Sequence, residues 1–146
     1  MLKRIILHDY RCFEKSELSL KDISIIVGNN NAGKSTIIEA LRIVSHIAQK
    51  FKNVSYFPAP LSLKLPVGNY GIYLNLESLK IDLKTIVHQY KTDVFAQIHA
   101  QFDNKTWIKV YLQNDMVFAT IENNEKNISR KAEARRVSDL NLFIMP

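Results

Sequence analysis

Residues 28–35 have the composition and spacing of a phosphate-binding loop. They read Gly-Asn-Asn-Asn-Ala-Gly-Lys-Ser and match the pattern GxxxxGK[ST], with Thr36 directly after it. In such a loop, successive backbone N–H groups wrap anionic oxygens, and the helix that follows adds the positive end of its dipole. The segment is therefore a candidate site for the phosphates of a nucleoside triphosphate.

The residues of the loop have separate expected roles. Gly33 lets the backbone approach a phosphate without a Cβ, and Asn tolerates left-handed backbone angles better than most residues. Lys34, the candidate catalytic residue, is predicted to reach the β- and γ-phosphates, Ser35 to hold Mg²⁺ through its hydroxyl, and Thr36 to bond near the α-phosphate. The predicted cofactors are ATP and Mg²⁺, and the predicted loop ligands are Gly28, Asn29, Asn30, Asn31, Ala32, Gly33, Lys34, Ser35 and Thr36.

The segments on either side of the loop are those that the motif requires. Residues 23–27 form a short, mostly β-branched run that stops at Gly28, which is typical of a buried strand ended by a turn. Residues 35–48 predict an amphipathic helix, because apolar residues recur at helical spacing, namely Ile37, Ala40, Leu41, Val44, Ile47 and Ala48. Strand, loop and helix thus follow one another directly.

Two further groups of strands are predicted around this unit. Residues 3–9 and 16–20 favour a pair of strands that form an antiparallel hairpin around residues 11–15. Alternating polar and apolar residues predict a three-stranded meander at residues 94–102, 106–112 and 116–121, with turns at 103–105 and 113–115.

The other segments have weaker patterns. Residues 49–73 hold three of the four prolines and predict a loop-like insertion that still packs, because its apolar side chains would be wasted in solvent. Residues 74–89 are ambiguous between helix and strand. Residues 123–138 are charged and favour either a solvated helix or disorder, and residues 140–144 favour a strand. We therefore divide the single unit 1–146 into parts 1–48, 49–73, 74–122 and 123–146.

Composition limits the class of protein. At 146 residues, with 47% hydrophobic and 23% charged residues, the chain is typical of one folded domain and unlike a disordered or fibrous protein. The net charge of +6 favours anionic partners. The lone Cys12 excludes an intrachain disulfide and fits a reducing cytoplasm. No apolar run approaches the roughly 18 residues of a membrane span, so we expect no membrane partner.

The first 45 residues or so resemble a known group of ATPases. The segment Tyr10-Arg11-Cys12-Phe13, followed by a short strand and the loop, is similar to the start of the ABC-type ATPase heads of RecF, the SMC proteins and above all the OLD (overcoming lysogenization defect) nucleases. In these families a segment N-F-R-x-F precedes a loop that often reads G-x-N-x-x-G-K-S/T. Asp9 and Tyr10 replace the usual Asn and Phe. Beyond this segment the resemblance is only architectural.

The resemblance implies a fold. We expect an α/β P-loop NTPase lobe, similar to an ABC ATPase, in which one P-loop helix packs on a mixed sheet beside an antiparallel β subdomain. The hairpin and the meander would build that subdomain. The resemblance also implies that Arg11 contacts the nucleotide phosphates from the side opposite Lys34. The alternative from the residues alone is a surface arginine in a hairpin turn.

Parts of a complete ABC-type ATPase are absent from the sequence. Such an enzyme needs four apolar residues followed by Asp-Glu, which support Mg²⁺ and orient the attacking water. The nearest runs, residues 79–82 and 137–139, are interrupted by polar residues, and no L-S-G-G signature occurs. We therefore expect the incomplete N-terminal lobe of a longer ATPase, whose C-terminal half is a further partner. The alternative is a complete small P-loop enzyme.

Function follows from the motif and the resemblance together. We predict the ATP-binding lobe of a cytoplasmic, DNA-processing ATPase, in DNA repair or antiviral defence, with an attached nuclease and a homodimer that sandwiches ATP. A basic cluster could touch DNA if its members share a face, namely Arg130, Lys131, Arg135 and Arg136. The alternatives are a transporter nucleotide-binding domain and a non-hydrolysing phosphate-binding adaptor. Asn31 counts against the transporter domain, because such domains usually have a glycine at that position of the loop.

Overall fold

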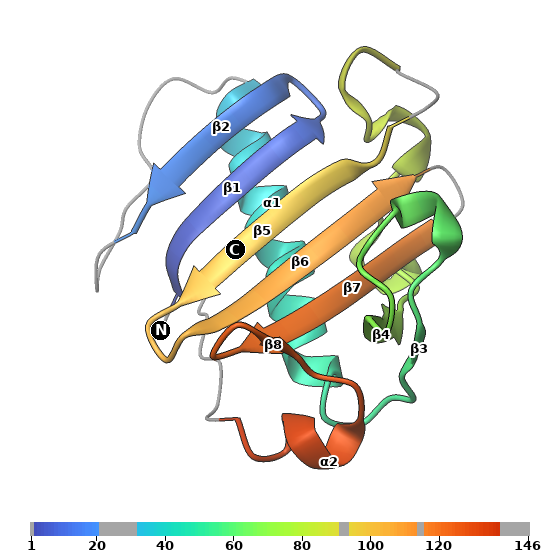
Figure 1. The fold of residues 1–146 in the computed structure, drawn as a ribbon. Helices are drawn as coiled ribbons and strands as arrows, with labels where there is room; N and C mark the ends of the chain where they lie inside the picture. The colour runs from blue at the N-terminus through green and yellow to red at the C-terminus, as the bar shows by residue number, and fades with distance from the viewer. Residues whose placement is uncertain (1, 21–31, 91–93, 114–115, 138–146) are drawn as a thin grey trace.

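The computed structural model describes residues 2–20, 32–90, 94–113 and 116–137, and an eight-stranded sheet is its main element. Seven strands lie in the order β2-β1-β5-β6-β7-β4-β3, and β8 also pairs with β7 (Figure 1). Every strand pairing between described residues is antiparallel. The strands are β1 (Leu2–Tyr10), β2 (Phe13–Ser19), β3 (Phe57–Pro58), β4 (Tyr70–Tyr73), β5 (Ala96–Phe102), β6 (Thr106–Gln113), β7 (Met116–Asn123) and β8 (Lys126–Asn127).

The first two strands form the predicted antiparallel hairpin, with a tighter turn than expected. Tyr10 pairs with Phe13, so that only Arg11 and Cys12 remain in the turn. The second strand begins at Phe13 rather than Ser16 because the half-buried Phe13 side chain packs against the core. The other edge of β1 pairs with β5, which places the hairpin beside the later meander in one sheet.

The predicted meander is confirmed, and each of its later strands runs slightly further than the alternation indicated. In β5, the buried residues alternate strictly with half-buried ones, as expected for a strand with one face on the core. β6 and β7 pair in continuous register from Thr106 opposite Asn123 to Gln113 opposite Met116.

The prediction of a loop at residues 49–73 was wrong at its end. Residues Tyr70–Tyr73 form β4, which pairs with β7, and β3 pairs in turn with β4. The four-residue strand is short, but Ile72 is fully buried, and the sheet edge of β7 supplies its hydrogen-bonding partner. Pro58 lies in the outermost strand, where its missing N–H costs no hydrogen bond.

The ambiguous segment at residues 74–89 is neither α-helix nor strand. It contains three 3-10 helices, η2 (Glu77–Leu79), η3 (Leu83–Thr85) and η4 (His88–Tyr90), and another, η1 (Leu61–Leu63), lies in the insertion. The charged segment after the meander is ordered as β8 and a short helix, α2 (Lys131–Ala134). The strands expected at residues 23–27 and 140–144 lie outside the described residues.

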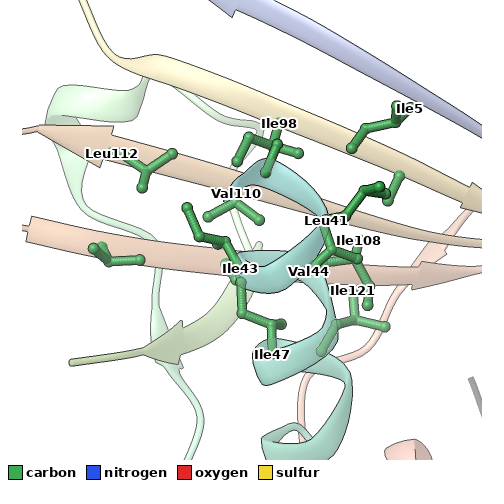
Figure 2. Close-up of a cluster of buried hydrophobic side chains, with 14 of the residues drawn as sticks. Ile5, Leu41, Ile43, Val44, Ile47, Ile98, Ile108, Val110, Leu112 and Ile121 are labelled. Atoms are coloured by element: carbon green, nitrogen blue, oxygen red, sulfur yellow. The ribbon is translucent and has the colours of Figure 1, made fainter. Parts of the chain in front are cut away.

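One long helix, α1 (Ala32–Lys50), crosses the face of the sheet that is turned away from the viewer in Figure 1. It confirms the predicted amphipathic helix and extends it at both ends. Figure 2 shows its apolar side chains meeting those of the central strands, where Ile43, Val44 and Ile47 lie among Ile98, Ile108, Val110 and Ile121, all fully buried. This layer of helix on sheet is the core of the described structure.

The arrangement corrects one expectation about the sheet. The helix was expected on a mixed sheet beside a separate antiparallel subdomain, but it packs directly on the antiparallel sheet that the hairpin and the meander build together. The hairpin and meander present one continuous apolar face, and α1 covers it. The mixed character depended on residues 23–27, which lie outside the described residues. No helix in the described part of the chain is long and apolar enough to cross a membrane.

Candidate phosphate-binding site

The described half of the predicted loop lies in the first turns of α1. Ala32 opens the helix, and Gly33, Lys34, Ser35 and Thr36 follow within it, whereas Gly28, Asn29, Asn30 and Asn31 lie outside the described residues. Ser35 is exposed, Lys34 is half-buried, and Thr36 is 6% exposed. The side chain predicted to hold Mg²⁺ is therefore open to solvent, while the one predicted to bond near the α-phosphate faces the protein.

The electrostatics of this helix end favour an anion. α1 is 19 residues long, and its first turn contains no acidic residue that would neutralise the positive end of the helix dipole. Lys34 adds a positive charge in the same turn. An anionic group placed at this end would therefore meet the backbone N–H groups of the first helical turn and a cationic side chain together.

The turn between β1 and β2 lies against this end of α1. The thiol of Cys12 is 3.8 Å from the hydroxyl oxygen of Thr36. Arg11 has a positive φ of 50°, an unusual conformation that its main-chain partners hold in place. Its N–H donates to the carbonyl of Ile86 at 2.7 Å, and its own carbonyl lies 2.6 Å from Nδ1 of His88.

The guanidinium of Arg11 is engaged by protein groups. Nε donates to Oε1 of Glu39 at 2.6 Å and Nη2 donates to Oε2 at 3.1 Å, which makes a bidentate ion pair with the helix. Nη1 donates to the hydroxyl of Thr85 at 2.7 Å, and Nη2 also donates to the carbonyl of Asp82 at 3.1 Å. Arg11 thus joins the hairpin, the helix and η3.

Tyr10 completes this cluster from the core side. Its ring is fully buried, and its hydroxyl donates to Oε1 of Glu39 at 2.5 Å. Burial, and then the negative charge of Glu39, raise the pKa of Tyr10 far above its ordinary value. Burial lowers the pKa of Arg11, but the hydrogen bond and the charge of Glu39 outweigh it, so that this pKa is raised. At neutral pH the cluster therefore holds a neutral phenol and a charged guanidinium, both bonded to Glu39.

Arg11 was predicted from the sequence as a site residue, whereas Tyr10 and Glu39 were not. The structure brings Arg11 to the same end of α1 as the loop residues, and its contact with a phosphate stays a prediction. One signal for Glu39 was available. It lies four residues before the buried Ile43 and next to the buried Ala40, so its carboxylate sits at the border of the apolar stripe and needs a partner.

Two other predicted groups are placed by the structure. Asp82 ends the first of the two interrupted runs, residues 79–82, and it caps η3 by accepting a hydrogen bond from the N–H of Lys84 at 2.9 Å. The second run, residues 137–139, ends outside the described residues. In the basic cluster, Arg130, Arg135 and Arg136 are exposed around α2, and Arg130 lies 3.3 Å from the carboxylate of Glu133.

Comparison with known proteins identifies the family of the chain. Residues 1–145 match the model of a protein family described as AAA ATPase domain. A segment of 44 residues is 46% identical to an OLD nuclease of Thermus scotoductus. That segment spans 30% of this chain and 8% of the nuclease, so the likeness concerns a short part of that protein.

Proposed function

Because the chain belongs to the family of AAA ATPase domains, we propose that it is the ATP-binding lobe of a DNA-processing ATPase similar to OLD nucleases. The observation that carries the proposal is the position of Gly33, Lys34, Ser35 and Thr36 in the first turns of a 19-residue helix packed on the central strands. This is where a phosphate-binding loop needs its lysine and hydroxyl side chains.

In this proposal each residue at the helix end binds a different part of the Mg-nucleotide. Lys34 neutralises charge on the β- and γ-phosphates, Ser35 binds Mg²⁺ through its exposed hydroxyl, and Thr36 bonds near the α-phosphate. Arg11 adds a second cation from the turn beside Thr36. Mg²⁺, when bound, neutralises charge that develops on the phosphates during transfer.

Hydrolysis requires groups beyond these. The sequence holds no run of four apolar residues followed by Asp-Glu, and the carboxyl group of Asp82 serves as a helix cap. We therefore propose that this chain binds Mg-ATP with little turnover, and that turnover needs further protein segments and a second head that closes over the nucleotide. A nuclease activity and a role in DNA repair or defence against phage belong to the same proposal.

Binding of Mg-ATP tests the proposal directly. We expect saturable binding by calorimetry, and we expect Lys34→Ala to weaken it by about 10- to 100-fold, because a hydrogen bond to a charged group contributes about 1.5–3 kcal/mol. Lys15→Ala, which removes an exposed lysine of β2, is the matched control and should leave the dissociation constant unchanged. Mg-GTP, measured in parallel, reports whether the site distinguishes the base.

A second candidate function has one observation in its favour. Since the acidic run needed for hydrolysis is missing from the sequence, a non-hydrolysing phosphate-binding module fits the same helix end. It predicts the same loss of binding in Lys34→Ala, but no ATP turnover with any added protein segment. Steady-state phosphate release, measured with an added protein segment that carries four apolar residues followed by Asp-Glu, separates the two functions.

A further inference from the structure

We propose that Glu39 is a positioning residue of the phosphate site, whose carboxylate competes with the nucleotide phosphates for the guanidinium of Arg11. Glu39 would then lower the affinity of the site for nucleotide and make binding depend on an exchange of partners by Arg11. The inference rests on the proposed function, because it takes ATP to bind at the N-terminal end of α1.

The ion pair of Arg11 and Glu39 lies close to the predicted phosphate site. The turn that carries Arg11 contacts Thr36, since the thiol of Cys12 lies 3.8 Å from its hydroxyl. Glu39 follows Thr36 by three residues, so the two lie on the same face of α1, about 4.5 Å apart along the helix axis. The guanidinium bound to Glu39 is therefore about one helical turn from the residue predicted to bond near the α-phosphate.

A phosphate and the carboxylate of Glu39 offer the guanidinium of Arg11 the same kind of partner. Arg11 binds Glu39 through two parallel N–H donors, at 2.6 and 3.1 Å, and a phosphate offers the same pair of oxygens with more negative charge. The side chains of Arg11 and Glu39 are each 21% exposed, so solvent reaches part of the pair. An incoming phosphate can thus take the guanidinium in the geometry that the carboxylate uses.

Glu39 keeps a partner when it loses Arg11. The hydroxyl of Tyr10 donates to Oε1 at 2.5 Å from a fully buried position. Burial and the charge of Glu39 raise the pKa of Tyr10, so the phenol keeps its proton. The carboxylate is therefore not left unsatisfied, which would otherwise oppose the exchange strongly.

The main chain of Arg11 need not move in this exchange. The bonds to the carbonyl of Ile86 and to the ring of His88 hold the backbone of the turn on both sides. The remaining side-chain contacts, to Thr85 and to the carbonyl of Asp82, lie at exposed positions where water replaces them at low cost. The proposed exchange therefore changes the partners of the Arg11 side chain and leaves its main-chain bonds in place.

The test is a double-mutant cycle on Mg-ATP binding by calorimetry. Glu39→Gln keeps the size of the side chain and its acceptor for Tyr10 but removes the charge that holds Arg11. We expect it to tighten binding about tenfold, Arg11→Ala to weaken binding, and Glu39→Gln to have no effect in the Arg11→Ala background. Glu122→Gln is the matched control, because Glu122 pairs with Lys109 at 3.1 Å and is 24% exposed, close to the 21% of Glu39.

Several outcomes would overturn the inference. Unchanged or weaker binding in Glu39→Gln contradicts competition, and equal tightening in the Arg11→Ala background assigns the effect to general charge instead. If the wild-type chain fails to bind Mg-ATP, the proposed function falls as well. If wild type binds and only Glu39→Gln fails to tighten, the inference alone is wrong.

A measurement on the wild-type chain tests the exchange without any variant of Glu39. The Nε–H proton of Arg11 donates to Glu39 at 2.6 Å, and Arg11→Lys identifies its signal in a proton–nitrogen spectrum. Addition of Mg-ATP should shift this signal as its acceptor changes. A signal that stays in place while ATP binds means that the guanidinium remains on the carboxylate, which contradicts the exchange.

Discussion

At the scale of single residues, His99 makes the stability of the folded protein depend on pH. Its ring lies in β5 between the buried Ile98 and Ala100, so it points to the face opposite α1. On that face its Nε2 lies 3.0 Å from Oε1 of Gln97, and the centre of its ring lies 5.4 Å from that of His8. Burial, and then the charges of Lys109 and His8, lower the pKa of His99 from 6.5 to about 4. The folded protein therefore favours the neutral ring.

This pKa predicts the direction of a stability change. Between pH 6.5 and about 4 the unfolded chain binds a proton that the folded chain excludes, so the free energy of unfolding falls as the pH drops through this range, by on the order of 2–3 kcal/mol. Urea unfolding at several pH values measures it, and His99→Gln should show a smaller fall than wild type. An equal fall in both proteins would contradict the assignment to His99.

The residues of the site were predictable to different degrees. Lys34 and Ser35 could be named because their pattern is local in the sequence. Glu39 could not be assigned a role in the same way, because its partners Tyr10 and Arg11 lie 29 and 28 residues away and meet it only through the hairpin turn. Pairs that depend on the packing of distant elements leave little trace in a single sequence.

At the scale of elements, β4 shows why a short strand was missed. It has four residues and contains Gly71, which sequence rules associate with loops rather than strands. The structure explains why a glycine occupies position 71. A Cβ at Gly71 would overlap the carbonyl oxygen of Ala119 and lie 2.7 Å from Cζ of Phe118, so β4 can approach β7 only without a side chain there. The helix α1, with its long apolar periodicity, was predictable.

The close approach at Gly71 predicts a localised cost. Gly71→Ala must displace β4 or Phe118, so we expect a loss of about 1–3 kcal/mol in the free energy of unfolding, measured with urea. Gly68→Ala is the control. Its added Cβ meets nothing within 4 Å, and its positive φ of 88° alone should cost about 1 kcal/mol. A larger loss in Gly68→Ala than in Gly71→Ala would show that contact with β7 is not the cause.

At the scale of the whole molecule, the net charge of +6 and the exposed arginines around α2 predict how DNA would bind. If Arg135 and Arg136 contact phosphates, replacing both with Ala should reduce the slope of log affinity against log salt by about 2. Fluorescence anisotropy with duplex DNA at several salt concentrations measures the slope. Lys15→Ala combined with Lys84→Ala removes equal charge from β2 and η3, and should leave the slope unchanged.

The order of strands in the sheet also has a consequence for synthesis of the chain. β1 lies between β2 and β5, yet β5 is made roughly ninety residues after β1, and α1 packs on strands that are also made after it. At about 5–20 residues per second, the ribosome needs on the order of 4–15 seconds to make the roughly 70 residues from the end of α1 to the end of β7. The nascent α1 therefore emerges before the meander strands that cover much of its apolar face, and chaperones have that interval in which to shield it.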